Sequence, residues 1–328
     1  MFFRRTGKGT VSLLDAGILF LSSAISLLLV SAYGHAQTSE LNYPTRPLTF
    51  IIPLPAGGNS ELATRLIIKQ AEKHLGQAII PVNKPGGSLT IGIAEIARAK
   101  PDGYTIGFSA FGPMTVVPFL QKVPYHPVND FKQIMQYGSF NVGLTVHADS
   151  PFKGLPDVVA YARQSQKKLT FGSVAVGLNM SIMKKIAEKE GIEFTAMPFG
   201  SAGPAEVALL GKHVDMVAGD FSPAFIEAGQ TRLLVVFRDE RSEEYPQIPI
   251  LKELGYNIPC RVFMGVHGPK GIPDIAVKKL EDAFTKGMKE PEFIKGMKEL
   301  RLPIFYRNTK DLGDYVAASY EIYKEFLR

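Results

Sequence analysis

Short apolar runs alternate with amphipathic segments along most of the chain. The runs have the length of buried strands, and the segments between them repeat apolar residues at the spacing of a helix face. In the first third, strands are predicted at 48–53, 78–83 and 104–110, and helices at 60–76 and 91–100. This strand–helix rhythm predicts an α/β fold with mostly parallel sheets and right-handed crossovers.

The same alternation returns after residue 140. Strands are predicted at 141–148, 168–174, 194–199, 214–220, 232–237 and 262–269, and helices at 155–164, 179–191, 203–213, 274–288, 291–300 and 309–327. Two α/β units in one chain predict two lobes with a cleft between them.

The N-terminal segment has the pattern of a secretory signal peptide. A positive start, MFFRRTGKGT, precedes the apolar stretch 16–32, and Gly34-His35-Ala36 places small residues before a cleavage site. We expect residues 1–36 to be removed after Ala36. An uncleaved membrane anchor is the alternative, since the apolar stretch is near the lower length limit for a span.

Composition narrows the function classes. The net charge of +6 comes from 37 basic and 31 acidic residues scattered along the chain, which argues against a nucleic-acid interface. The single cysteine, Cys260, excludes an internal disulfide. The chain lacks a P-loop, a GxGxxG motif, a GxSxG motif and a histidine spacing typical of metal sites, so no cofactor, metal or catalytic residue is expected.

Small polar turns follow several predicted strands. They occupy 55–60, 109–114, 173–179, 199–205 and 218–224. In open α/β sheets, ligands bind at the carboxyl ends of strands, where helix N-termini present unpaired amides to anions. Each turn alone is equally consistent with ordinary capping, but five together favour an anion-binding cleft.

Several ordered motifs resemble one family. YPTRPLTFIIPLPAGGNSELATR, VNKPGG, PDGYT, VPYHPVNDF, GPAEVALLGKHVD and GPKGIP are similar, in order and spacing, to the tripartite tricarboxylate transporter substrate-binding proteins of the Bug/TctC family. The resemblance covers essentially all of residues 43–328. It implies a two-lobe periplasmic binding protein of the type II, Venus-flytrap kind, expected to be a monomer, that passes a small organic acid to a membrane permease.

The resemblance also implies lobe boundaries and ligand contacts. Lobe 1 would comprise residues 40–141 plus 259–328, and lobe 2 residues 142–258, with hinges near 141–144 and 256–262. The implied ligand-binding residues are Pro55, Gly57, Gly58, Asn59, Ser60, Ser109 and Phe111 in lobe 1, and Ser173, Gly177, Asn179, Phe199, Ser201, Gly203 and Asp220 in lobe 2.

Some positions depart from the family pattern. Glu61 replaces the usual aspartate, Ala175 a frequent glycine and Ser181 a frequent histidine. Leu178, Met180 and Phe111 make the predicted cleft edge more apolar than citrate would favour, which leaves room for an aromatic, branched-chain or amino acid. Glu61 either compensates the dipole of its own helix or receives a ligand ammonium.

Two other function classes compete with a transport receptor. The same cleft would serve a signalling receptor that docks on a sensor kinase. An exported enzyme on this scaffold would need a nucleophile–base pair or a metal cluster, and the motifs provide neither.

Overall fold

The computed structural model describes residues 42–165, 167–174, 177–200 and 202–327. Arg46–Arg328 forms one compact unit, and of the Met1–Thr45 unit only residues 42–45 are described. The predicted signal peptide and its cleavage site after Ala36 therefore lie outside the described residues. Among the helices within them, none has the length and apolar content that crossing a bilayer requires.

The first of two sheets, sheet A, has the strand order β11-β4-β10-β3-β1-β2. β1 pairs in parallel with β2 and β3, whereas β10 runs antiparallel to β3 and β4, and β11 antiparallel to β4. The strands are β1 (Leu48–Ile52), β2 (Ile79–Asn83), β3 (Thr105–Ala110), β4 (Phe131–Gly138), β10 (Met264–Pro269) and β11 (Ile304–Arg307).

The second sheet, sheet B, has the order β7-β6-β8-β5-β9. β6 pairs in parallel with β7 and β8, and β5 runs antiparallel to β8 and β9. The strands are β5 (Val142–His147), β6 (Leu169–Val174), β7 (Phe194–Phe199), β8 (Met216–Asp220) and β9 (Thr231–Val236). All five strands of sheet B fall between the fourth and fifth strands of sheet A along the chain.

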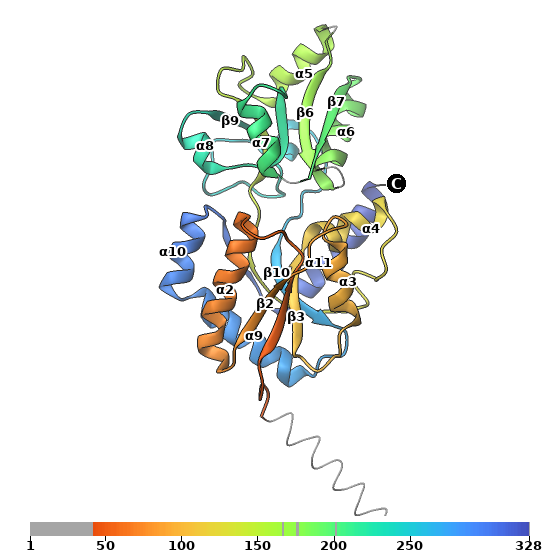
Figure 1. Ribbon diagram of the computed structural model, residues 1–328. Coiled ribbons are helices and arrows are strands. Elements are labelled where there is room, and N and C mark those ends of the chain that lie inside the picture. Colours follow the sequence, from red (N-terminus) through yellow and green to blue (C-terminus); the bar gives the residue numbers. More distant parts are fainter. Residues whose placement is uncertain (1–41, 166, 175–176, 201, 328) are drawn as a thin grey trace, which may run out of the picture. The chain divides into compact units, whose positions relative to one another are not determined.

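Helices accompany each sheet (Figure 1). Those of sheet A are α2 (Asn59–Leu75), α3 (Thr90–Arg98), the π-helical η1 (Gly112–Val116), α4 (Val117–Leu120), α9 (Asp274–Met288), α10 (Pro291–Glu299) and α11 (Thr309–Phe326). Those of sheet B are α5 (Leu155–Gln164), α6 (Leu178–Glu190), α7 (Ala202–Leu210) and α8 (Pro223–Glu227). A 3₁₀ turn, η2 (Leu251–Leu254), follows β9.

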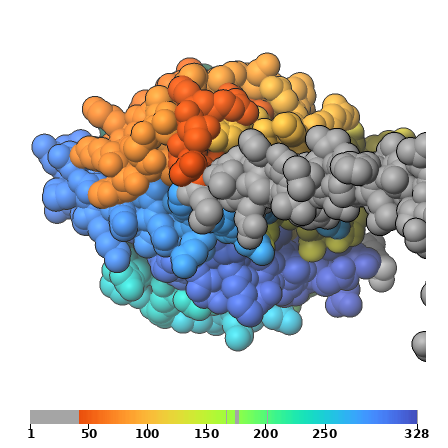
Figure 2. Space-filling model, turned by 90° about the horizontal axis from the view of Figure 1, so that it is seen from below, coloured from red at the N-terminus to blue at the C-terminus, as the bar shows by residue number. Residues whose placement is uncertain are grey.

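Sheet A is held to its helices by a packed apolar layer. The ring of Phe50 on β1 lies 6.1 Å from that of Phe284 on α9, and both side chains are fully buried. α2 packs on α9 so closely that a Cβ at Gly287 would lie 2.9 Å from the amide nitrogen of Ala71. Segments far apart in the sequence, drawn orange and blue, therefore lie side by side (Figures 1 and 2). This packing fixes the position of α2, whose N-terminus opens on the site described below.

The predicted α/β fold with two sheets is confirmed. The expectation that the sheets would be mostly parallel was wrong, because both are mixed and β10, β11 and β5 pair antiparallel to their neighbours. Sequence reasoning missed β4, where buried polar residues interrupt the apolar pattern. Gln133 and Gln136 are 6% and 1% exposed. The hydroxyl of Ser109 donates to Gln133 Oε1 at 2.9 Å, and Gln136 Nε2 donates to the carbonyl of Gly138 at 2.9 Å, so both amides are satisfied inside the core.

Candidate functional site

The turn between β1 and α2 leaves the first amides of the helix without a side-chain cap. Gly58 is the N-cap residue, and because glycine has no side chain it cannot bond to the amides that begin α2. Those amides and the helix dipole give the turn a partial positive charge. The turn can therefore accept an anion.

Glu61 organises this turn from within. Its Oε2 accepts the amide of Gly57 at 3.2 Å, and its Oε1 accepts Arg65 Nε at 2.5 Å and Asn83 Nδ2 at 3.1 Å. Burial alone would raise the pKa of Glu61, but these hydrogen bonds outweigh it and lower the pKa. The carboxylate is 1% exposed and already engaged by three donors, which supports its structural role over contact with a ligand ammonium.

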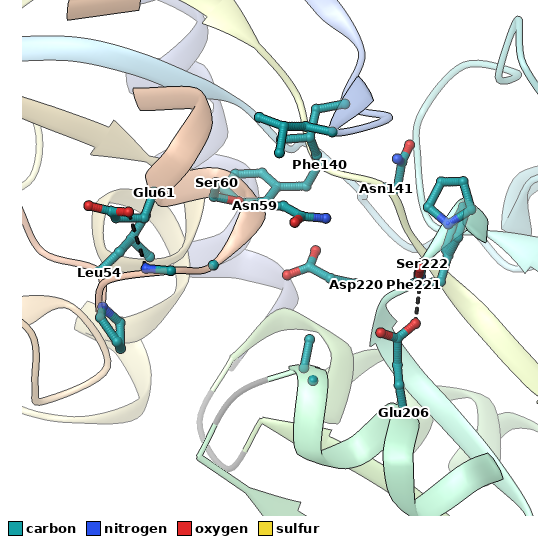
Figure 3. Close-up of a pocket in the computed structure, with 18 of the residues that line it drawn as sticks. Leu54, Asn59, Ser60, Glu61, Phe140, Asn141, Glu206, Asp220, Phe221 and Ser222 are labelled. Atoms are coloured by element: carbon teal, nitrogen blue, oxygen red, sulfur yellow. Dashed lines mark hydrogen bonds between the residues drawn. The ribbon is translucent and has the colours of Figure 1, made fainter. Parts of the chain in front are cut away.

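The turn opens into a cavity of about 650 Å³, a size typical of small-molecule sites (Figure 3). Its walls come from the β1–α2 turn, the segment that follows β4, the start of α7, the end of β8 with the start of α8, and the residues after α10. The lining residues are 54–61, Phe140, Asn141, Ala202, Gly203, Glu206, Val207, 220–223, Phe225, Leu300 and Leu302.

Two carboxyl groups face this cavity from the sheet B side. The carboxyl group of Asp220 extends from the end of β8 toward Asn59, and Glu206 lies on α7 beside it (Figure 3). Glu206 Oε1 accepts the amide of Ser222 at 2.5 Å. Burial raises the pKa of Glu206 to about 7, despite that bond. Desolvation by the surrounding protein, and then the charge of Glu206, raise the pKa of Asp220 to about 7, although Asp220 is exposed at the cavity wall.

Both carboxyl groups therefore have pKa values raised toward neutral, and the charge of Glu206 contributes to the shift at Asp220. A protonated member donates a hydrogen bond, and an ionised member accepts one. One wall of the cavity thus presents uncapped amides, and another presents two carboxyl groups whose protonation can change near neutral pH. This arrangement suits an anionic ligand that also carries a polar group.

Comparison with known proteins decides the family. A sequence model described as "Tripartite tricarboxylate transporter family receptor", TctC, matches residues 63–327. A Cupriavidus necator protein, "UPF0065 protein in gbd 5'region", is 33% identical over 306 residues, covering 92% of this chain and 91% of its own length. The chain belongs to the TctC receptor family.

Solved structures agree with this assignment. A TctC solute-binding protein from Polaromonas, solved without ligand, is 28% identical with a TM-score of 0.73, covering 87% of this chain and 99% of its own. The periplasmic binding protein BugD is 26% identical with a TM-score of 0.74, covering 86% and 97%. The fold is that of the two-lobe solute-binding proteins.

The cavity of this TctC receptor brings together half of the residues predicted for the site. The predicted residues that line it come from the β1–α2 turn, from the start of α7 and from the end of β8. They are Pro55, Gly57, Gly58, Asn59, Ser60, Gly203 and Asp220.

The other predicted residues of lobe 1 lie behind the cavity wall. Ser109 is fully buried and bonded to Gln133. The ring of Phe111 packs edge-on against that of Phe140, with ring centroids 5.4 Å apart, and it is Phe140 that faces the cavity. A ligand contact by either residue stays a prediction.

Four of the remaining predicted residues of lobe 2 lie on β6, at the start of α6 and at the end of β7. Ser173 Oγ and Asn179 Oδ1 are buried without a hydrogen-bond partner among the described residues. Gly177 is the N-cap of α6, and Phe199 packs over Gly172. Ser201 lies outside the described residues. Their role as ligand contacts also stays a prediction.

Sequence reasoning missed Glu206, Phe140 and Asn141, which line the cavity. Glu206 carried a usable signal, because it is the single acidic residue in the otherwise apolar stretch GPAEVALLG. Phe140 follows β4, a strand that was not predicted, whereas Asn141 was expected at the hinge but not among the residues that line the cavity.

Proposed function

We propose that the mature protein is an extracytoplasmic receptor that captures a small organic carboxylate and delivers it to a membrane permease. One observation carries this proposal: the uncapped N-terminus of α2 opens into a cavity of about 650 Å³ in a TctC receptor. A carboxylate bound there would accept hydrogen bonds from the amides that Gly58 cannot cap.

The proposed mechanism uses two lobes on a hinge. Residues 40–141 plus 259–328 would form one lobe and 142–258 the other. The chain passes from sheet A to sheet B between β4 and β5, and returns between β9 and β10. A ligand that touches both lobes stabilises the closed form, and closure excludes water and strengthens each amide–carboxylate bond.

The proposed export route is a signal peptide, residues 1–36, cut after Ala36, which would place the receptor in the periplasm. Two Rhodopseudomonas palustris proteins of the same fold, 23% and 24% identical to this chain, hold malate and adipate. At that identity the two structures show only the fold, and their ligands are not assigned to this chain. For this chain we propose the broader class of small carboxylates, with an aromatic or amino acid among the candidates.

Native mass spectrometry of the gently purified mature protein would test whether it carries a ligand, and denaturing analysis would identify the released acid. Measuring the melting temperature of the protein with each member of a panel of carboxylates and amino acids extends the search. We expect a discrete acid or a stabilising member of the panel. A protein that releases nothing and gains no stability from any member would refute the proposal.

A matched pair of variants at Gly58 tests where the carboxylate binds. Gly58 has φ −81° and ψ 154°, and a Cβ there meets nothing within 4 Å, so both variants fit the backbone. Gly58→Asp supplies its own carboxylate to the first amides of α2, whereas Gly58→Ala supplies none. We expect Gly58→Asp to bind the identified acid at least about tenfold more weakly and Gly58→Ala to bind like the wild type. Equal affinity in both variants would place the carboxylate elsewhere.

A further inference from the structure

A second cavity, of about 180 Å³, lies where the chain passes between the two sheets. Residues from both crossing segments line it, together with residues of β4, β11 and α11. The lining residues are Gln136, Ser139, Arg238, Asp239, Glu240, Cys260, Arg261, Val262, Phe305, Arg307 and Tyr315. It shares no lining residue with the larger cavity.

Its walls are cationic and its rim is acidic. Arg238, Arg261 and Arg307 are half-buried, whereas Asp239 and Glu240 are exposed. Asp239 lies 3.4 Å from Arg261 and also accepts a backbone amide, so its charge is already engaged. Arg238 has no ion pair within 4.0 Å among the described residues, although its charge acts on the nearby Glu244. The cavity therefore gathers three arginines, and the donors of Arg238 are not taken by a carboxylate in direct contact.

Aromatic stacking holds two of the guanidinium groups in place. The carbon atoms of the Arg261 and Arg307 guanidinium groups lie 4.5 Å and 3.9 Å from the ring centroid of Tyr315. Arg307 Nη1 also donates to Gln136 Oε1 at 2.5 Å. Burial lowers the pKa of Arg307, and the charge of Arg261 acts in the same direction. Both guanidinium groups are thus held against the same ring, and Arg261 Nη1 also donates to Ser319 Oγ at 3.3 Å.

We propose that this cavity binds a small oxyanion between Arg238, Arg261 and Arg307. The planar guanidinium fork matches a carboxylate or a tetrahedral oxyanion, and a pre-organised fork loses little freedom on binding. The anion relieves the repulsion between Arg261 and Arg307 and gives Arg238 a partner.

The bound anion also joins the start and the end of the segment that returns from β9 to β10, because Arg238 and Arg261 both lie on it. Ser139 Oγ already donates to the carbonyl of Val262 at 3.3 Å, so the two crossing segments are in contact at this point. An anion held by Arg238 and Arg261 would restrain the conformation of the segment between β9 and β10, which carries both arginines. Any effect on closure of the larger cavity rests on the proposed function, whereas the anion site itself does not.

Inorganic phosphate is the probe for this site. Isothermal titration at low ionic strength would compare the wild type with Arg238→Gln and Arg261→Gln. The matched control is Arg98→Gln, which removes the same charge from the exposed last turn of α3. We expect each cavity variant to lose about tenfold or more in phosphate affinity and the control to lose almost none. Equal affinity in all four proteins, or no phosphate binding by the wild type, would overturn the proposal.

Gly58→Asp separates this site from the larger cavity, because phosphate could also bind at the N-terminus of α2. We expect this variant to bind phosphate like the wild type. Loss of phosphate binding in Gly58→Asp alone would overturn the proposed oxyanion site and leave the receptor proposal standing. A crystal soaked in selenate gives a direct readout, with an anomalous peak expected among the three arginines, and a peak only at the α2 N-terminus would refute the site.

Discussion

Replacing His267 by leucine is expected to remove much of the acid sensitivity of folding. His267 lies on β10 in the middle of sheet A and is fully buried. Its ring stacks on that of Phe131, with centroids 4.6 Å apart and planes 6° from parallel. Neither ring nitrogen has a hydrogen-bond partner among the described residues. Leucine has a similar volume and no polar atom to satisfy.

The size of the effect follows from the pKa. Burial lowers the pKa of His267 from 6.5 to about 3, so the folded protein keeps this ring neutral while the unfolded chain protonates it below pH 6.5. Stability is therefore lost as the pH falls from 6.5 toward 3. Between pH 7 and pH 5 the loss is about 2 kcal/mol. Asp220 and Glu206, with pKa values raised to about 7, act in the opposite direction but are common to both proteins.

Urea unfolding of wild type and His267→Leu at pH 7 and pH 5 measures this difference. We expect the wild type to lose about 2 kcal/mol more than the variant on acidification. His213→Leu, which removes an exposed imidazole after α7, is the matched control and should keep the wild-type difference. If His267→Leu also kept that difference, the ring would not be held neutral by burial and the reasoning would fail.

Three further predictions concern the turn, the helix contact and the acidic pair. Glu61→Gln replaces an ionised acceptor of three hydrogen bonds, and we expect urea unfolding to show a loss of about 1–3 kcal/mol. Gly287→Ala should cost a similar ~1–3 kcal/mol through its contact with α2, while Gly313→Ala, with open space around its Cβ, should be neutral or slightly stabilising. Because Asp220 has a pKa near 7, binding of a carboxylate should take up a proton; affinity should rise from pH 8 to pH 6, and less so in Asp220→Asn. Titration calorimetry with the acid identified by mass spectrometry checks this, and identical slopes in both proteins would contradict it.

The sequence predicts most elements of this fold because their local signals agree. The predicted helix 274–288 coincides with α9, and the predicted strand 194–199 with β7. β4 was missed because buried polar side chains interrupt its apolar pattern. β11 was missed because it is short. The pairing of β10 between β3 and β4 could not be predicted, since no local signal states which distant strands become neighbours.

In the candidate site, too, features with a local sequence signal were predicted, and features that depend on long-range packing were not. The glycine-rich turn at 55–60 can be predicted from the sequence, because an apolar strand leads into a helix without a capping side chain. The effect of Glu206 on the pKa of Asp220 could not be predicted from the sequence, because it depends on which carboxyl groups the fold brings together. The same holds for Ser109, whose hydroxyl is taken by a glutamine on an unpredicted strand.

The strand order of sheet A has a consequence for how the chain folds as it is made. β10 lies between β3 and β4, and it begins only at Met264. Sheet A therefore cannot be completed until most of the chain has left the ribosome. The strands of sheet B all fall within residues 142–236, so every partner in this sheet is available before β10 is made, and sheet B can form first. Sheet A, which holds the first strands of the chain, is thus the last to be completed.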